Sequence, residues 1–263
     1  MNDTPVLVDR EAAVATITLN HPEQRNALDR DTKEALRDAV ASVAGDRRVR
    51  AVVLAAAGPT FCVGQDLGEH ATALAGGAEA AFATVRKHYS PIVRDLMTMP
   101  KPVVAAVGGA CVGAGLGLAL ACDYRVFATG AKLGTAFTAI GLTFDSGLSV
   151  TLARAVGESR ARELILFGRT FTAEQGVDWG IAGEVVAPED VLARAGELAG
   201  QLAQGPTTAY ADTKRLLAEA PGRSLEDCLE AEAAAQTRCG RTEDHANAVA
   251  AFIGREKPTF TGA

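Results

Sequence analysis

Apolar residues recur with two different periods along the first half of the chain, and these periods predict alternating strands and helices. The β-branched run Val6-Leu7-Val8 and residues 14–19 have the length and composition of the two strands of a hairpin. Over residues 29–44 apolar positions recur every three or four residues, with acidic side chains in the first turns, which is typical of an amphipathic helix. Residues 51–55 form another apolar strand, so this part is a strand-helix-strand unit.

A second such unit follows near the middle of the chain. The pattern predicts a buried strand over residues 103–107, a turn over 108–113, a helix over 114–122 and a further strand over 124–128. Between Leu67 and Tyr89 the chain is rich in Ala and Gly and weakly patterned, so we expect a mobile loop around Gly76 and Gly77. Helical periodicity then dominates, over residues 147–156, 159–167, 173–179, 189–204, 207–218 and 224–239. This order predicts an α/β fold followed by a mostly helical C-terminal part.

Length, charge and cysteine usage limit the number of domains, the class of partner and the cellular compartment that we expect. The 263 residues suffice for one main body and a smaller C-terminal unit, and the net charge of -6 is dispersed without a basic run, which argues against a nucleic-acid partner. The uncharged stretch over residues 103–122 could cross a bilayer, but its glycines favour a strand, a tight turn and a buried helix. Five scattered cysteines and an N-terminus without a signal-peptide pattern favour the cytoplasm.

Several chemistries are disfavoured by what the sequence lacks. The four histidines have no metal-ligand spacing, so no metal site is expected, and no G-x-S-x-G elbow marks a serine hydrolase. The central cluster over residues 113–117 reads G-x-G-x-G, which differs from the dinucleotide-binding G-x-G-x-x-G, and the P-loop signature is absent.

Two glycine turns carry the candidate chemistry. In the motif FCVGQDL, residues 61–67, Gly64 permits a bend that leaves the N–H of Gln65 without a sheet partner. In the motif GAG, residues 113–115, a helix begins, and its first N–H groups have no intrahelical acceptor and carry the positive end of the helix dipole. Each turn alone is most simply explained by tight packing, but two free donors aimed at one point would make an oxyanion hole.

Together these motifs resemble the crotonase superfamily, also called the enoyl-CoA hydratase/isomerase superfamily. The resemblance extends over LNHP at 19–22, NAL at 26–28, KPV at 101–103 and AFIGREKP at 251–258. It implies a crotonase-like ββα spiral core over residues 1–200 and a helical C-terminal region over residues 201–263 that mediates trimerisation. It also implies that the N–H groups of Gln65 and Ala114 hold the oxygen of an acyl-CoA thioester, with Ala114 standing where glycine is usual.

The same resemblance implies positions that bind the substrate, whose coenzyme A is carried as part of it, so that no separate cofactor is expected. The backbone near Gln24, Arg25 and Ala27 would meet the adenine end, and Phe252 and Arg255 would lie near the nucleotide, completing a neighbour's site in a homotrimer or a dimer of trimers. The other positions assigned to the acyl-CoA site are Cys62, Gly64, Asp66, Leu67, Gly113 and Phe137. The C-terminal motif could also be simply a solvated terminal helix.

The reaction depends on which carboxylates are present. Hydratases of the family resemble one another in two glutamates, and the matching positions here are Gly117 and Phe137. Asp145 falls where the 1,2-epoxyphenylacetyl-CoA isomerases of phenylacetate breakdown place an aspartate, although the local stretch has Phe144 in place of Pro and Leu148 in place of Gly. Asp145 would then be the acid/base of an isomerase, in an apolar pocket formed by Phe137, Ile140, Leu142 and Phe144. Its structural alternative is the N-cap of a helix that begins at Ser146.

Three functions therefore remain open. The first is a CoA-thioester isomerase that converts 3-enoyl-CoA to 2-enoyl-CoA in fatty acid metabolism, or 1,2-epoxyphenylacetyl-CoA to oxepin-CoA. The second is an enoyl-CoA hydratase that uses another carboxylate, such as Asp66 or Glu69. The third is an acyl-CoA-binding member with an oxyanion hole but weak catalysis.

Overall fold

Two β-sheets organise the body of the protein in the computed structural model, which describes residues 4–263. Within these residues the larger sheet has six strands and the smaller has four. The larger sheet runs in the order β1 (Val6–Glu11), β2 (Val14–Leu19), β3 (Ala51–Ala56), β5 (Val103–Val107), β7 (Tyr124–Ala128) and β10 (Gly183–Val186). The smaller sheet runs in the order β4 (Thr60–Cys62), β6 (Ala110–Val112), β8 (Lys132–Gly134) and β9 (Thr170–Thr172).

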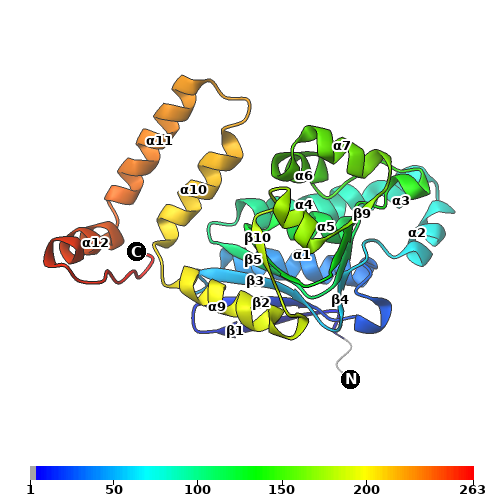
Figure 1. Ribbon diagram of the computed structural model, residues 1–263, viewed down its shortest axis with the longest axis horizontal. Helices are drawn as coiled ribbons and strands as arrows, with labels where there is room; N and C mark the ends of the chain where they lie inside the picture. The colour runs from blue at the N-terminus through cyan, green and yellow to red at the C-terminus, as the bar shows by residue number, and fades with distance from the viewer. Residues whose placement is uncertain (1–3) are drawn as a thin grey trace.

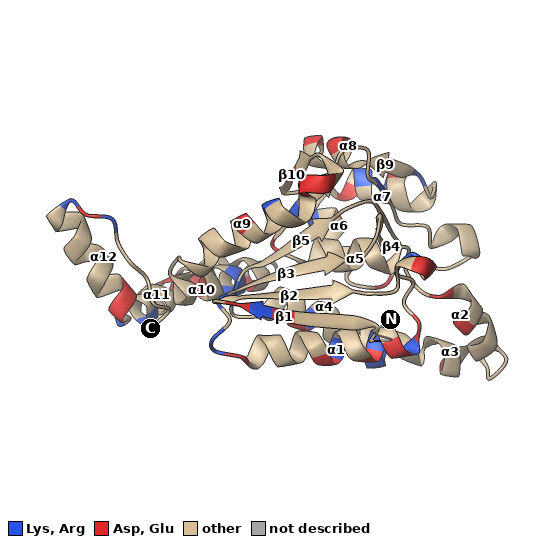
Figure 2. Ribbon diagram, turned by 90° about the horizontal axis from the view of Figure 1, so that it is seen from below, with Lys and Arg blue, Asp and Glu red and all other residues tan. Residues whose placement is uncertain are grey.

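The larger sheet is parallel except for its first pair. β1 and β2 form the predicted antiparallel hairpin, and β2, β3, β5, β7 and β10 pair in parallel. All residues of β5 are buried and apolar, as expected for a strand covered on both faces. Figure 2 shows the two covers, with α1 (Arg30–Gly45) on one side of the strands and α9 (Val191–Ala203) on the other.

The predicted helix after the hairpin is α1, and its local sequence explains both its start and its orientation. The Asp29 side chain caps it by accepting a hydrogen bond from the Thr32 N–H at 2.8 Å. Leu36, Val40 and Val43 lie on one face at helical spacing and are fully buried in the core. The apolar stripe therefore fixes which side of α1 meets the sheet.

Successive units of the chain repeat the same order of elements. Strands β3, β5 and β7 of the larger sheet are each followed directly by a strand of the smaller sheet, β4, β6 and β8. Helices follow β4 and β6, the second being α5 (Ala114–Ala121), so the chain winds as a ββα spiral (Figure 1). The α/β fold class and the spiral core expected from the sequence are confirmed.

The segment between Leu67 and Tyr89 is mostly helical, so the expected loop around Gly76 and Gly77 is reduced to a short turn between two helices, and its mobility stays a prediction. It forms α2 (Leu67–Leu74), α3 (Ala78–Thr84) and a π-helical turn (Val85–Tyr89), which continues into α4 (Ser90–Thr98). Alanine is the best helix former, and the Asp66 side chain caps α2 through the Glu69 N–H at 2.7 Å. The predicted turn over residues 108–113 likewise contains β6, which is too short to show a period.

Helix α8 (Ala173–Asp178) packs against β8 and β9 of the smaller sheet, whereas α6 (Leu148–Val156) packs against α5 and α7 (Glu158–Leu166); the bounds of all three helices lie within two residues of those predicted. Helix α9 spans the expected division between residues 200 and 201. None of the helices formed by residues 4–263 is long and apolar enough to cross a membrane.

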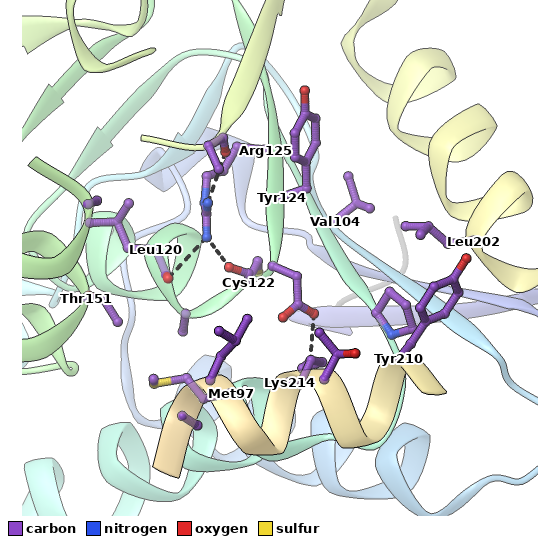
Figure 3. Close-up of a pocket in the computed structure, with 18 of the residues that line it drawn as sticks. Met97, Val104, Leu120, Cys122, Tyr124, Arg125, Thr151, Leu202, Tyr210 and Lys214 are labelled. Carbon is purple, nitrogen blue, oxygen red and sulfur yellow. Dashed lines mark hydrogen bonds and ion pairs between the residues drawn. The ribbon is translucent and has the colours of Figure 1, made fainter. Parts of the chain in front are cut away.

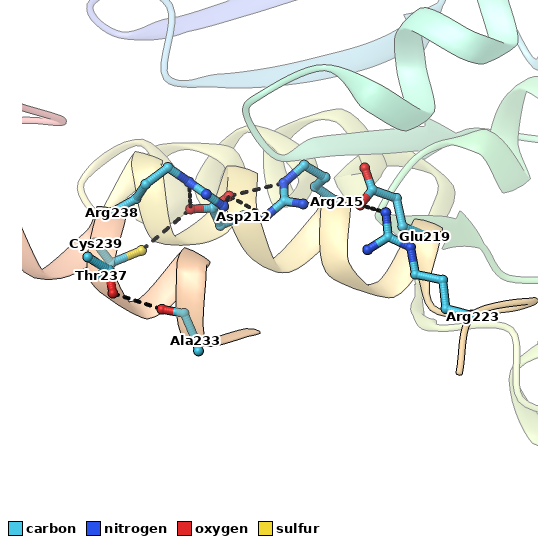
Figure 4. A network of polar contacts seen from close by, with 8 residues as sticks. All are labelled: Asp212, Arg215, Glu219, Arg223, Ala233, Thr237, Arg238 and Cys239. Atoms are coloured by element: carbon cyan, nitrogen blue, oxygen red, sulfur yellow. Dashed lines mark hydrogen bonds and ion pairs between the residues drawn. The ribbon is translucent and has the colours of Figure 1, made fainter. Parts of the chain in front are cut away.

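Three C-terminal helices form an arm (Figure 1): α10 (Thr207–Glu219), which contacts α4 of the body, and α11 (Leu225–Gly240) and α12 (Glu243–Gly254), which extend away from it. A polar network ties α10 to α11, in which the buried Asp212 carboxylate accepts hydrogen bonds from Arg238 at 2.8 Å and Arg215 at 3.1 Å (Figure 4). Large apolar side chains are exposed on the arm, namely Leu217, Leu225, Leu229, Val249, Phe252 and Ile253.

Candidate active site

The two glycine turns singled out in the sequence meet backbone to backbone. Gly64 has φ of +87° and Gly113 has φ of +59°, both in the region that favours glycine. A Cβ atom on Gly64 would lie 3.1 Å from the Val112 carbonyl oxygen and 3.3 Å from the Ala114 nitrogen. Glycine at position 64 allows this close approach, so the backbone of the β4–α2 turn packs directly against the backbone of the β6–α5 turn.

Where the two turns meet, two backbone N–H groups have no hydrogen-bond acceptor among the described residues. The Leu28 N–H donates to the Gly64 carbonyl at 2.8 Å and the Asp66 N–H donates to the Leu28 carbonyl at 3.2 Å, so the Gln65 N–H between them is not used. Ala114 is the first residue of α5 and has no intrahelical acceptor. Within residues 4–263 neither N–H has a hydrogen-bond acceptor, and both residues line one cavity of about 250 Å³. This is the arrangement that an oxyanion hole requires.

Close packing beneath the two turns explains why glycine stands at position 115 and why Cys62 does not reach the cavity. A Cβ on Gly115 would lie 2.4 Å from the Cys62 carbonyl oxygen, so α5 touches β4 directly. Cys62 itself is fully buried, its sulfur accepts a hydrogen bond from the Gly64 N–H at 3.4 Å, and burial raises the pKa of its thiol to about 12. Cys62 therefore lies under the cavity as a packed, protonated side chain and does not line it.

Asp145 lies in the same cavity as the two free donors. One carboxylate oxygen, Oδ1, accepts a hydrogen bond from the Ser146 hydroxyl at 2.7 Å. Burial raises the pKa of Asp145, and the Ser146 hydrogen bond opposes that rise. The alternative role as a helix cap is wrong, because α6 begins at Leu148 with Gly147 as its N-cap and without a side-chain cap.

The positions of the family's two hydratase glutamates are filled differently here. A Cβ on Gly117 would lie 2.4 Å from the Ser146 Cβ and 2.7 Å from the Ser146 carbonyl oxygen. The segment that carries Asp145 therefore occupies the space that a side chain at position 117 would need. Phe137, at the second position, is part of the cavity wall.

The remaining wall is mainly apolar and comes from segments far apart in the sequence. Ile140 and Leu142 line the cavity as predicted, whereas Phe144 packs against the core outside it. Leu67 and His70 come from α2 and Phe82 from α3. Sequence reasoning missed His70 and Phe82, because both lie in the stretch interpreted as a loop and no local pattern marks them.

Tyr89 supports this side of the site. Its hydroxyl donates to the Gln65 side-chain oxygen at 3.2 Å, and burial together with the nearby Asp145 raises the pKa of Tyr89.

The predicted coenzyme A segment is anchored by a residue that received no role from the sequence. Asn26 is fully buried, accepts from the His21 N–H at 2.9 Å, and donates to the carbonyls of Ala57 at 2.9 Å and Thr60 at 2.8 Å. These bonds hold the loop that carries Gln24, Arg25 and Ala27 against the β3–β4 connection. Arg25 and Gln24 are exposed, and Ala27 is buried.

Four residues considered from the sequence lie outside the cavity. Phe252 is 84% exposed on α12, and Arg255 follows that helix, at the opposite end of the molecule from α2 and α3 (Figures 1 and 2). Within one chain they do not meet the cavity. Asp66 caps α2 and Glu69 pairs with Lys33 at 2.8 Å, and neither acidic side chain lines the cavity.

A larger cavity of about 910 Å³ lies between the body and α10 (Figure 3). Three of its four charged side chains are already engaged, since Lys214 donates to Asp123 at 2.6 Å and Arg125 donates to the carbonyls of Ala119 and Cys122, whereas Arg154 makes no hydrogen bond or ion pair within residues 4–263. The cavity holds neither the two free N–H groups nor Asp145, so we assign the candidate chemistry to the smaller one. No cluster of His, Cys, Asp and Glu within residues 4–263 could hold a metal ion.

Comparison with known proteins adds a family to this geometry. The family model described as enoyl-CoA hydratase/isomerase matches residues 9–263. The chain is 36% identical to the 1,2-epoxyphenylacetyl-CoA isomerase of Escherichia coli (strain K12), over 98% of each protein, and 37% identical to a Rhodobacter capsulatus protein named probable enoyl-CoA hydratase, over 95% of each. A solved structure of an enoyl-CoA hydratase/isomerase homologue from Mycobacterium abscessus superimposes with a TM-score of 0.94 at 48% identity, covering 98% of this chain and all of that one.

Proposed function

The chain belongs to the enoyl-CoA hydratase/isomerase family, and from that membership we propose that it is a CoA-thioester isomerase with Asp145 as its acid/base. One observation carries this proposal. Asp145 shares a mainly apolar cavity with the two free N–H groups of Gln65 and Ala114, and no other carboxylate among residues 4–263 lines that cavity.

The chemistry follows from the geometry. The thioester oxygen binds between the N–H groups of Gln65 and Ala114, which stabilise the negative charge that develops on it. Asp145 removes a proton from C2 to give the enolate and returns it at C4, which moves the double bond from C3 to C2. In 1,2-epoxyphenylacetyl-CoA the same contacts would stabilise ring expansion to oxepin-CoA, the reaction class suggested by the name of the Escherichia coli relative. The substrate carries its own coenzyme A, so we propose no further cofactor.

The environment of Asp145 suits a group that both accepts and returns a proton. An ordinary aspartate is too weak a base for this work near neutral pH, and burial raises the pKa of Asp145 toward the operating range. The Ser146 hydroxyl occupies Oδ1 and thereby leaves Oδ2 as the oxygen that carries the proton. A single shuttling carboxylate is sufficient for isomerisation.

The hydratase alternative requires a second carboxylate to activate water. Gly117 provides none, and its packing against Ser146 leaves no room for one. Asp66 and Glu69 are engaged in a helix cap and an ion pair outside the cavity. A hydratase reading is supported by the name of the Rhodobacter capsulatus relative, and formation of a 3-hydroxyacyl-CoA from a 2-enoyl-CoA would favour it over isomerisation.

The deciding experiment mixes the purified protein with a 3-enoyl-CoA and follows the conjugated 2-enoyl thioester by absorbance. We expect wild type to convert it and Asp145→Asn, shown to be folded by circular dichroism, to lose most of the activity. Equal activity of the two proteins would remove Asp145 from the mechanism. If neither protein converts 3-enoyl-CoA, 1,2-epoxyphenylacetyl-CoA is the next substrate. Failure of wild type to exchange the C2 protons of a saturated acyl-CoA with deuterium would favour the third function, a binding protein with weak catalysis.

We also propose that the arm completes the site of a neighbouring copy in a homotrimer or a dimer of trimers. The exposed Phe252 and the cation of Arg255 would then meet the nucleotide of a coenzyme A bound next door, where a guanidinium suits phosphate. The cytoplasm is the proposed location. Sedimentation at micromolar concentration should show an oligomer, and a monomer that binds acyl-CoA fully would contradict this arrangement.

A further inference from the structure

His70 stands out among the polar side chains that line the acyl cavity. The Gln65 side-chain oxygen accepts from Tyr89, the Thr135 hydroxyl donates to the Leu164 carbonyl, and Asp145 accepts from Ser146. Within residues 4–263 neither ring nitrogen of His70 has a hydrogen-bond partner. Among the described residues, His70 is therefore the polar side chain of the cavity wall that makes no hydrogen bond at all.

The surroundings of the ring indicate which nitrogen is available to a ligand. The ring of His70 meets the ring of Phe82 edge to face, with centroids 5.3 Å apart, and Nδ1 is enclosed by protein without a partner. A neutral imidazole carries one N–H and one lone pair. Buried N–H groups without an acceptor are rarer than underused acceptors, so we place the proton on Nε2 and the lone pair on the enclosed Nδ1. His70 then presents an N–H donor.

The helix that carries His70 is fixed on two sides, so the donor is positioned before any ligand binds. Asp66 caps the first turn of α2, and Glu69 pairs at 2.8 Å with Lys33 of α1, whose side chain is fully buried. Glu69 thus faces α1, while its neighbour His70 faces the cavity. Little conformational freedom is left to lose when a ligand accepts the hydrogen bond.

We propose that His70 is a specificity-determining residue, which donates a hydrogen bond from Nε2 to an oxygen of the acyl group other than the thioester oxygen. The substrate class would then be acyl-CoA thioesters that carry a hydroxyl, carbonyl or epoxide oxygen. This inference rests on the proposed acyl-CoA function and deepens it. Of the two isomerase substrates considered above, only 1,2-epoxyphenylacetyl-CoA has such an oxygen.

The test measures binding and requires no turnover. Isothermal titration calorimetry compares hexanoyl-CoA with 4-, 5- and 6-hydroxyhexanoyl-CoA, which have no double bond to move, on wild type and His70→Leu. At least one hydroxylated thioester should lose about fivefold to tenfold in affinity on the substitution, the size of one neutral hydrogen bond, while hexanoyl-CoA keeps or gains affinity. Leu67→Ala, on the same helix and the same wall, should weaken both types of ligand alike.

A second variant separates the hydrogen bond from general packing. His70→Gln keeps an N–H donor and should retain much of the preference for the hydroxylated ligand. If wild type binds hexanoyl-CoA and His70→Leu weakens no hydroxylated thioester selectively, the inference about His70 is overturned and the proposed function stands. If hexanoyl-CoA does not bind wild type at all, the acyl-CoA site itself is wrong and both proposals fall.

Discussion

Replacing Gly117 by alanine should damage both stability and activity, because the added methyl group meets the segment that holds Asp145. The new Cβ would lie 2.4 Å from the Ser146 Cβ and 2.7 Å from the Ser146 carbonyl oxygen, so the two must separate by about 1 Å to reach van der Waals contact. Ser146 is buried and has φ of +51°, which leaves it few other conformations. The 145–147 segment is therefore expected to move as a unit.

The expected magnitudes come from two opposing effects. Alanine in a helix interior is better than glycine by about 0.5–1 kcal/mol. Overpacking of a tight core costs about 1–3 kcal/mol, so Gly117→Ala should lower the free energy of unfolding by about 1–2 kcal/mol. A displacement of about 1 Å at a catalytic group can lower kcat by roughly 100-fold.

Urea unfolding followed by circular dichroism and the 3-enoyl-CoA absorbance assay measure the two effects. Gly196→Ala is the matched control, because Gly196 lies exposed in helix α9 with nothing within 4 Å of a new Cβ. It should gain about 0.5–1 kcal/mol of stability and keep wild-type activity. If the Gly117→Ala variant is as stable and as active as the Gly196→Ala variant, the packing of Ser146 against Gly117 does not fix the position of Asp145.

Three further predictions concern the charge and the donors of the site. Ser146→Ala removes a hydrogen bond that lowers the pKa of Asp145, so the acid limb of the kcat/KM profile should move to higher pH; an unmoved limb would contradict this. The folded-state pKa of Asp145 is raised, so stability is lost as the pH rises from the unfolded-state pKa to the folded-state pKa; Asp145→Asn should be more stable than wild type at neutral pH but not below about pH 4, as thermal unfolding at both pH values would show. Ala114→Pro removes one free N–H at the first helical position, where proline is tolerated, so kcat should fall roughly 100- to 1000-fold with an unchanged circular dichroism spectrum; full activity would exclude Ala114 as a donor.

The sequence predicts the strands of the larger sheet better than those of the smaller sheet, for a physical reason. β5 and β7 have the predicted bounds because both are mainly buried in the sheet, and β5 is wholly apolar. The strands of the smaller sheet have three residues each and show no period, so pattern reasoning passes over them. The helices of the 67–89 segment were missed because their alanines give weak contrast between the two faces.

The sequence predicts those parts of the site in which backbone groups carry the chemistry. Gly64 and Gly113 mark two turns that can be located from the sequence, and the structure brings both turns together with Asp145. Phe252 was predicted through a family motif, and its place near a nucleotide stays a prediction, since a single chain holds it far from the cavity. His70 gave no signal, because its significance depends on the absence of a partner in three dimensions.

The backbone contact between Gly64 and the Gly113–Ala114 turn has a consequence for how the protein acquires its activity. Each turn belongs to a different ββα unit, and the loop around Leu28 is hydrogen-bonded to the first of them. Loops that close over such sequence separations form slowly compared with individual helices. During refolding, the far-ultraviolet signal of the helices should thus return before catalysis, and recovered turnover would report completion of the last long-range contacts.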